Sequence, residues 1–400
     1  MEFRPHDFAR RWVEDGHEVT ILAASFSHLR SFNPRARGRS TEEWLDGVRF
    51  RWIRTPSYEG NGLGRIRSIH AFLRGVDRER RTWMQDRDVD AVIASSTYPF
   101  DIDPCQRLAR EKKALLVWEV HDLWPLSPIE LAGYSPRHPF IRVTQRAEDR
   151  CCRQADLVVS MLPHAIDHLA TRGLDESRYV HIPNGASEPE ASPAGRSESP
   201  ARLVEALRSK GDFVLVHAGG VGEYHGLSNL LEAASRCRRP GLSIVIIGDG
   251  PNKDRLRRNA ARLDLPDIHF VPRVSRSEAV AAMRASSATF AGLQAHSIYR
   301  FGIGLNKIYD GMLSGRPIVA AYTAGNDPIK EAACGISVPA DQPAELARAI
   351  ESLRAATPIE LDAMGESGRC FVRKHHDHAT LARRFMTAMQ EASPRGSVRS

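Results

Sequence analysis

The sequence predicts an α/β protein made of two doubly wound domains, each with a parallel sheet covered by helices. The chain has 400 residues, more than one hydrophobic core usually organises. Short and almost wholly apolar segments alternate with helical patterns, which is typical of parallel strands buried on both faces. Between the halves, residues 186–200 contain three prolines, four serines and no large apolar residue, the composition of a linker or mobile loop.

The first domain is expected over residues 1–185. It opens with a helical pattern in which Phe8 and Trp12 share one side and Gly16 ends the helix. Segment 48–54 alternates apolar and polar residues, which predicts an edge or antiparallel strand. Apolar segments that predict buried strands lie at residues 18–25, 90–95, 114–120 and 156–161.

The opening helix raises the question of what comes before it. A helix that feeds a parallel strand normally crosses over from an earlier strand. We therefore expect that a first strand and its glycine loop, about 10–20 residues by ordinary strand and loop lengths, are missing ahead of Met1. A helix that simply starts the fold is the alternative, and the genomic sequence upstream of Met1 distinguishes the two.

The second domain is expected over residues 201–370, followed by a C-terminal helix and tail over 371–400 that can return to the first domain. Ligands of doubly wound sheets bind beyond the carboxyl ends of the strands. With two such domains, the sequence predicts a ligand site in a central cleft between them. Predicted strands of this domain lie at residues 213–220, 243–250, 268–271, 288–293 and 318–321.

Composition limits the partners of this chain. A net charge of +7 and a pI near 9.2 favour nucleotides, phosphates, acidic lipids or nucleic acid. The sequence contains neither a signal-peptide pattern nor an apolar run of about 18 residues that could span a membrane. Six cysteines form no Cys-x-x-Cys pair, which indicates free thiols in a reducing cytoplasm.

The segment 301–320 combines a glycine loop, a short helix and a strand. A helix beginning at Lys307, capped by Asn306, offers unpaired N–H groups and a positive dipole end to an anion. Lys307 adds a full charge, and Asp310, one turn later, can accept hydrogen bonds from ribose hydroxyls. A glycine-rich turn with an ordinary surface Lys–Asp pair explains this segment alone equally well.

Two further glycine turns follow predicted strands of the same domain, at 217–234 and 246–251. The first contains Gly220 and Gly222, but His225 stands where a dinucleotide fingerprint has its last glycine. A dinucleotide cofactor is therefore not expected, whereas a glycine loop before a helix still suits a phosphate group.

The sequence resembles the family 4 retaining glycosyltransferases, which have the GT-B fold. It is most similar to the WbuB-like branch, which builds bacterial surface polysaccharide, through residues 2–28 and 121–131. The matching segments cover most of the chain in the order of the family: GHEVTILAASFS (16–27), EVHDLWP (119–125), IPNG (182–185), HAGGVGEYHGL (217–227), VIIGDGP (245–251), NKIYDGMLSGRPIVA (306–320) and ACGISVPADQPAELARAI (333–350).

The resemblance implies a catalytic role for His121, which faces the reacting sugar in the family, with Asp122 following it. An imidazole there can hydrogen-bond a donor hydroxyl or stabilise developing charge; a capping histidine is the alternative. The resemblance also implies retention through front-face attack, with a donor phosphate oxygen taking the acceptor proton. We expect that none of the Asp-x-Asp triplets and no His/Cys cluster of this sequence holds a metal, and we expect no cofactor.

In the second domain, Asp310 falls where family members carry a glutamate that binds the nucleotide ribose. The backbone around Gly302 and Ile303 falls where the donor diphosphate lies, and Lys307 is near the phosphates in the branch. The resemblance thereby assigns this domain to the nucleotide-sugar donor and the first domain to the acceptor.

The sequence also departs from the family pattern. Many members place an arginine and a lysine on the diphosphate where this chain has Gly220 and His225. The expected replacements, in order, are Lys307, Arg300 and Arg273, together with backbone amides.

The expected donor is a UDP-linked N-acetylamino sugar, and the expected acceptor is a glycan or a polyprenyl-diphosphate-linked sugar. Segment 64–81 has apolar residues at helical spacing and six arginines against two acids. It suits either an ordinary helix on the sheet or a peripheral contact with the anionic inner face of the plasma membrane. Nucleic acid is not an expected partner.

Two other functions fit the same pattern. A UDP-sugar 2-epimerase on this scaffold would release a free UDP-sugar epimer, and a non-catalytic protein would bind the nucleotide sugar without transferring it.

Overall fold

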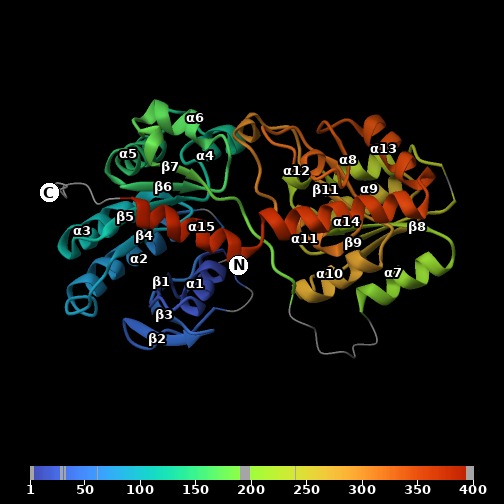
Figure 1. The fold of residues 1–400 in the computed structure, drawn as a ribbon. Coiled ribbons are helices and arrows are strands. Elements are labelled where there is room, and N and C mark those ends of the chain that lie inside the picture. Colours follow the sequence, from blue (N-terminus) through green and yellow to red (C-terminus); the bar gives the residue numbers. More distant parts are fainter. Residues whose placement is uncertain are drawn as a thin grey trace. The chain divides into compact units, whose positions relative to one another are not determined.

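The computed structural model describes residues 4–27, 30, 33–60, 62–189, 199–238 and 240–392. It divides into two compact units (Figure 1). Unit 1 comprises Met1–Pro183 and His378–Ser400, and unit 2 comprises Asn184–Asp377. Much of the linker expected over 186–200 lies outside the described residues. The cleft expected between the domains stays a prediction.

The sequence boundaries at 185 and 370 differ from the division seen in the structure. Helix α14 (Pro358–His375) begins with a capping box at Thr357 and continues past residue 370, so unit 2 extends to Asp377. The last helix, α15 (His378–Glu391), belongs to unit 1. It packs on α1 (Arg4–Glu14), where Trp12 Nε1 donates to the carbonyl of Ala382 at 2.9 Å.

Unit 1 contains two sheets. A parallel four-stranded sheet has the order β4-β5-β6-β7, and a three-stranded sheet has the order β1-β3-β2. Its strands are β1 (Thr20–Ala24), β2 (Ser40–Leu45), β3 (Val48–Ile53), β4 (Ala91–Ala94), β5 (Leu115–Val120), β6 (Leu157–Ser160) and β7 (Tyr179–His181). The four predicted strands are confirmed, although β1 is only half-buried along its length.

The strand predicted over 48–54 as an edge or antiparallel strand is confirmed as antiparallel to one neighbour, but it is not an edge. It pairs antiparallel with β2 and parallel with β1, so it is the central strand of its sheet and not an edge. Its inner face carries Val48, Phe50 and Trp52 into a small core, whereas the neighbouring β2 is mostly exposed. The polar positions of β3 therefore reflect a sheet whose other face is partly solvated.

The helices of unit 1 cover these sheets, and their apolar faces form the core with the strands. Phe8 and Trp12 of α1 pack with Phe385 of α15, at ring-centroid distances of 5.9 and 5.3 Å. The remaining helices are α2 (Leu63–Arg81), α3 (Ile102–Lys112), α4 (Leu126–Ala132), α5 (Pro139–Gln154) and α6 (Ala165–Leu169), with short 3-10 turns η1 (Pro99–Asp101), η2 (Ala170–Arg172) and η3 (Glu176–Arg178).

Helix α2 is the segment predicted over 64–81. Phe72 and Val76 are buried against Ile53 of β3, which confirms an apolar side that packs on the sheet. Ile66, nearer the start of the same helix, is 48% exposed. Across the described part of the chain, none of the helices has the length and apolar character needed to cross a membrane.

Unit 2 contains one six-stranded parallel sheet with the order β10-β9-β8-β11-β12-β13. The order reverses between β8 and β11, so the turns after these two strands lie at the switch point of a doubly wound sheet. The strands are β8 (Phe213–Ala218), β9 (Leu242–Ile247), β10 (Ile268–Val271), β11 (Ala288–Gly292), β12 (Ile318–Ala321) and β13 (Gly335–Val338). All five predicted strands are confirmed.

Helices cover both faces of this sheet (Figure 1). Besides α14, they are α7 (Pro200–Ser209), α8 (Leu227–Ala234), α9 (Lys253–Arg262), α10 (Arg276–Ala285), α11 (Asn306–Ser314), α12 (Pro328–Glu331) and α13 (Pro343–Ala355), with 3-10 turns η4 (Glu223–His225) and η5 (Ser297–Phe301).

The expected capping of α11 was wrong by one residue. The N-cap is Leu305, which has extended backbone angles, and no side chain caps it; Asn306 is already helical. Gly315 ends the helix in the left-handed conformation, with φ 68°. The start of α11 therefore presents uncapped backbone rather than an asparagine side chain.

Candidate functional site

Lys307 lies in the first turn of α11, and its side chain reaches the glycine loop 219–226 that follows β8. A Cβ placed on Gly219 would lie 3.4 Å from Lys307 Cε and 3.5 Å from Nζ. Gly219 also has φ 149°, a conformation that side chains rarely adopt. Glycine at this position therefore lets the lysine lie directly against the loop backbone.

The ammonium group of Lys307 is buried and makes no hydrogen bond to any of the described residues. Burial lowers the pKa of Lys307 to about 8. An unpaired charge in a protein interior costs several kcal/mol, even after relaxation. A cation held in this way beside a glycine loop and a helix N-terminus is arranged to receive an anion.

Two neutral histidines accompany Lys307. Burial, followed by the nearby Lys307 charge, lowers the pKa of His225 to about 4 and lowers that of His217 as well. His225 Nδ1 accepts a hydrogen bond from the Gly222 N–H at 3.0 Å, so the proton of the neutral ring is on Nε2. His225 therefore offers a neutral donor where the family pattern has a charged side chain.

The predicted loop glycines, Gly220 and Gly222, wrap around His225. A Cβ on Gly220 would lie 2.8 Å from His225 Cε1, and one on Gly222 would lie 3.3 Å from Nδ1. His217, which the sequence analysis missed, is fully buried at the end of β8 and bonds the Phe290 carbonyl through Nδ1 at 3.2 Å. The structure thus brings Gly220, Gly222, His225 and Lys307 together.

Two predicted backbone donors already have hydrogen-bond partners in the protein. The Gly302 N–H donates to the Tyr299 carbonyl at 2.9 Å, and the Ile303 N–H donates to Asn326 Oδ1 at 2.8 Å. Gly302 has φ 100°, which favours glycine. These contacts occupy both N–H groups, and the role of residues 302 and 303 toward a diphosphate stays a prediction.

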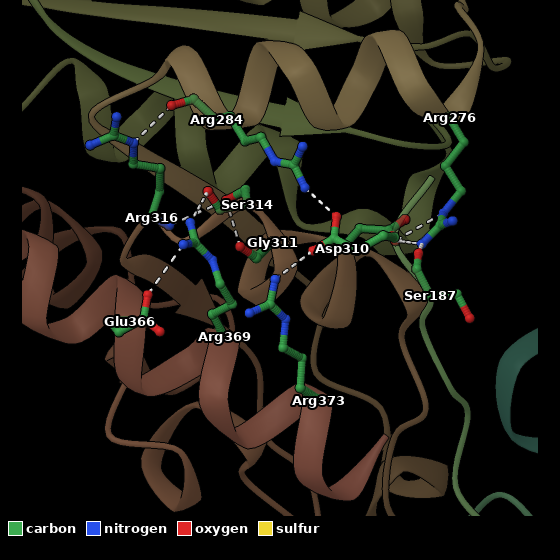
Figure 2. Close-up of polar contacts among 11 residues, drawn as sticks. Ser187, Arg276, Arg284, Asp310, Gly311, Ser314, Arg316, Glu366, Arg369 and Arg373 are labelled. Carbon is green, nitrogen blue, oxygen red and sulfur yellow. Dashed lines mark hydrogen bonds and ion pairs between the residues drawn. The ribbon is translucent and has the colours of Figure 1, made fainter. Parts of the chain in front are cut away.

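Asp310, the predicted ribose ligand, pairs with an arginine that the sequence analysis did not single out. Arg276, the first residue of α10, donates to Asp310 Oδ1 from Nε at 3.0 Å and from Nη2 at 2.6 Å (Figure 2). Its Nη2 also donates to the Ser187 carbonyl at 2.8 Å. The arginine holds this carboxylate, whose side chain is 19% exposed, in one orientation through Oδ1.

Other arginines surround the C-terminal end of α11 (Figure 2). Arg369 Nη2 donates to the Ser314 carbonyl at 3.3 Å, and Arg316 Nε donates to the Arg284 carbonyl at 2.8 Å. Carbonyl groups at a helix C-terminus attract cations. Helix capping therefore explains this cluster.

The last two predicted donor residues are exposed. The Arg273 N–H donates to Asp249 Oδ2 at 2.9 Å, in the glycine turn after β9. Arg300 donates to the Ser297 carbonyl at 2.6 Å and lies over the Phe301 ring. Their contacts stabilise local turns, and their roles toward a donor stay predictions.

In unit 1, His121 follows β5 and is buried, with 6% exposure. Its Nε2 lies 2.9 Å from Ser95 Oγ and 3.4 Å from Glu119 Oε2. Asp122, the other predicted catalytic residue, is exposed. The structure therefore builds a buried polar cluster around His121 and leaves Asp122 at the surface.

Glu119 is the residue of this cluster that the sequence analysis missed. It is 2% exposed, and its Oε1 accepts from Arg4 Nε at 2.8 Å. Arg4 also donates to the carbonyls of Ile182 and Pro183 at 2.7 and 2.6 Å. A glutamate inside the apolar segment 114–120 was the available signal, since a charge in a buried strand requires a partner.

The comparison with known proteins decides the family. Residues 1–185 match the Glycosyl transferase 4-like domain, and residues 212–355 match Glycosyl transferases group 1. This chain is a family 4 glycosyltransferase. The family and the GT-B fold that the sequence predicts are both confirmed.

Individual proteins agree with this assignment. The probable glycosyltransferase WbjE of Pseudomonas aeruginosa is 24% identical over 337 residues, which are 82% of this chain and 80% of WbjE. O-antigen chain mannosyltransferase C of Escherichia coli is 26% identical over 130 residues, 32% and 33% of the two chains. The structure of Anabaena HepE in complex with UDP and glucose shares the fold with a TM-score of 0.64 at 17% identity, covering 86% of this glycosyltransferase and 87% of HepE.

Proposed function

We propose that this glycosyltransferase moves an N-acetylamino sugar from a UDP-linked donor to a glycan or a polyprenyl-diphosphate-linked acceptor. The process would be the assembly of bacterial surface polysaccharide. One observation carries the donor assignment: the buried, unpaired ammonium of Lys307 lies against the 219–226 loop at the start of α11. A diphosphate supplies the counter-charge that this ammonium lacks.

In this proposal, Lys307 and the Nε2–H of His225 bind the diphosphate, while Asp310, oriented by Arg276, binds the ribose hydroxyls. The acceptor oxygen bonds to the anomeric carbon on the face that UDP leaves, so configuration is retained. A phosphate oxygen of the donor takes the acceptor proton. UDP departs with the electron pair of the broken carbon–oxygen bond, stabilised by Lys307. His121 hydrogen-bonds the transferred sugar, and the reaction is expected to need no metal.

The chemistry of the relatives supports the proposal. HepE has been determined with UDP and glucose, and mannosyltransferase C acts on the O-antigen chain. The sequence resemblance points to the same class of donor. A cytoplasmic location with peripheral membrane contact belongs to the proposal as well: Leu63 and Ile66 of the arginine-rich α2 are 74% and 48% exposed.

The test is a transfer assay with a panel of nucleotide sugars and a polyprenyl-diphosphate-linked sugar as acceptor. We expect UDP release coupled to a product with the anomeric configuration of the donor, measured by NMR. His121→Ala should lower kcat about 100-fold while UDP affinity changes little. Full turnover in that variant would make His121 structural. A free UDP-sugar epimer would indicate an epimerase, and binding without turnover would indicate a non-catalytic protein.

A further inference from the structure

A chain of buried contacts in unit 1 ends on His121. Arg4 binds Glu119. Ser95 Oγ lies 2.5 Å from Glu119 Oε2 and 2.9 Å from His121 Nε2. We propose that Ser95 and Glu119 are positioning residues that fix the tautomer and the orientation of the His121 imidazole. This inference rests on the proposed function, in which His121 contacts the transferred sugar.

The protons in this series of contacts can be assigned in order, starting from the ion pair between Arg4 and Glu119. Burial alone would raise the pKa of Glu119, but the charge of Arg4, followed by His121, holds it well below its usual range. Glu119 is therefore ionised, and an ionised carboxylate only accepts hydrogen bonds. The single proton of the Ser95 hydroxyl must then point to Glu119 Oε2.

The orientation of Ser95 decides the tautomer of His121. With its proton committed to Glu119, Ser95 Oγ can only accept from the ring, so the contact of 2.9 Å requires a proton on His121 Nε2. Whenever the ring is neutral, its lone pair is therefore on Nδ1. A hydroxyl interposed between a carboxylate and an imidazole thus specifies which ring nitrogen accepts.

Arg4 makes this assignment rigid. Its guanidinium occupies Glu119 Oε1 and also donates to the carbonyls of Ile182 and Pro183. The carboxylate of Glu119 is therefore held by Arg4 of the first helix and by Ser95 and His121 at the ends of two neighbouring strands. The carbonyls after β7 in turn hold Arg4. Supporting contacts of this kind keep a functional side chain in its productive geometry.

A direct reading of the tautomer uses the full chain labelled with 15N-histidine. The signal of His121 is identified as the one lost in His121→Gln. We expect chemical shifts of a proton on Nε2 in the wild type and in Ser95→Thr, and loss of that preference in Ser95→Ala. A proton on Nδ1 in the wild type, or unchanged shifts in Ser95→Ala, would overturn the inference. This readout does not depend on catalysis.

Kinetics then separate positioning from mere structural support. Ser95→Ala should lower kcat about tenfold with an unchanged Kd for UDP, because the donor nucleotide is assigned to unit 2, and Ser95→Thr should restore kcat. Ser160→Ala is the matched control: this hydroxyl also lies at a strand end, but it accepts from the Leu162 N–H. An unchanged kcat in Ser95→Ala overturns the inference. If the wild type transfers no sugar although His121 has the assigned tautomer, the proposed function fails and the tautomer assignment stands.

Discussion

The two units bury charge in opposite ways. Glu119 of unit 1 is surrounded by partners, namely Arg4, Ser95 and His121. Lys307 of unit 2 is equally removed from water, yet its Nζ has no hydrogen-bond partner within the described part of the chain. Removing a partner from the paired charge of Glu119 would leave a buried charge uncompensated, and the ammonium of Lys307 is already in that costly state.

The largest expected effect comes from breaking the paired site. Glu119→Ala leaves the Arg4 guanidinium buried without a counter-charge, and we expect a loss of about 4 kcal/mol in the free energy of unfolding. Chemical denaturation measures it. Glu18, whose side chain is 70% exposed, pairs with Arg49 at 3.0 Å and provides the matched control. Glu18→Ala should cost less than about 1 kcal/mol. Equal losses in both variants would show that burial of the Glu119–Arg4 pair adds nothing to its effect on stability.

The unpaired site should respond with the opposite sign. Lys307→Met keeps the length of the side chain and removes its charge, so we expect the free energy of unfolding to rise by about 1–3 kcal/mol. Its affinity for UDP should fall about 100-fold, because the diphosphate loses its buried cation. Calorimetric titration and thermal unfolding check both effects. Lys330→Met, at an exposed lysine, should change neither, and undiminished UDP affinity in Lys307→Met would refute the donor site.

A smaller effect is expected at Asp310. Asp310→Asn should weaken UDP binding about tenfold, since an amide replaces the carboxylate at the ribose hydroxyls while the fold is retained. Asp362→Asn, at a side chain that is 72% exposed and pairs with Arg316, serves as the control for charge removal near α11. If Asp310→Asn binds UDP as tightly as the wild type, Asp310 serves only to hold Arg276.

The smallest expected effects are the pH dependences of UDP affinity and of stability that follow from the unpaired charge of Lys307. The pKa of Lys307 is about 8 in the folded chain, below its ordinary value of 10.5. UDP affinity should therefore fall by up to about tenfold per pH unit above pH 8, as the ammonium deprotonates. Stability should rise over the same range up to about pH 10.5, since the unfolded chain then binds the extra proton. Both slopes should be absent in Lys307→Met, and a pH-independent affinity in the wild type would contradict the assignment.

The sequence predicted those parts of the fold and site that depend on local pattern. Apolar runs identified the buried strands, and the 301–320 segment identified Lys307 and Asp310. The strand β2 was missed because its residues are mostly exposed and polar. The surroundings of Lys307 were predicted in part. The loop glycines indicate that another group approaches the backbone closely, but they do not indicate the tautomer of His225.

Contacts between residues far apart in the sequence could not be predicted from pattern. Arg4, Ser95 and Glu119 are separated by up to 115 positions, and Arg276 is 34 positions from Asp310. Only the packing of β4 beside β5 brings Ser95 next to Glu119. These pairings decide which carboxylate is ionised and where it points. Sequence motifs alone do not carry this information.

The placement of α15 has a practical consequence for protein engineering. Because the last helix completes the core of the first unit through Phe385, unit 1 is discontinuous in the chain, and unit 2 is an insertion between residues 183 and 378. Cutting the gene after residue 183 would strip Phe8 and Trp12 of their cover. A chimera that exchanges unit 2 should therefore replace residues 184–377 as an internal segment and keep both flanks from one parent.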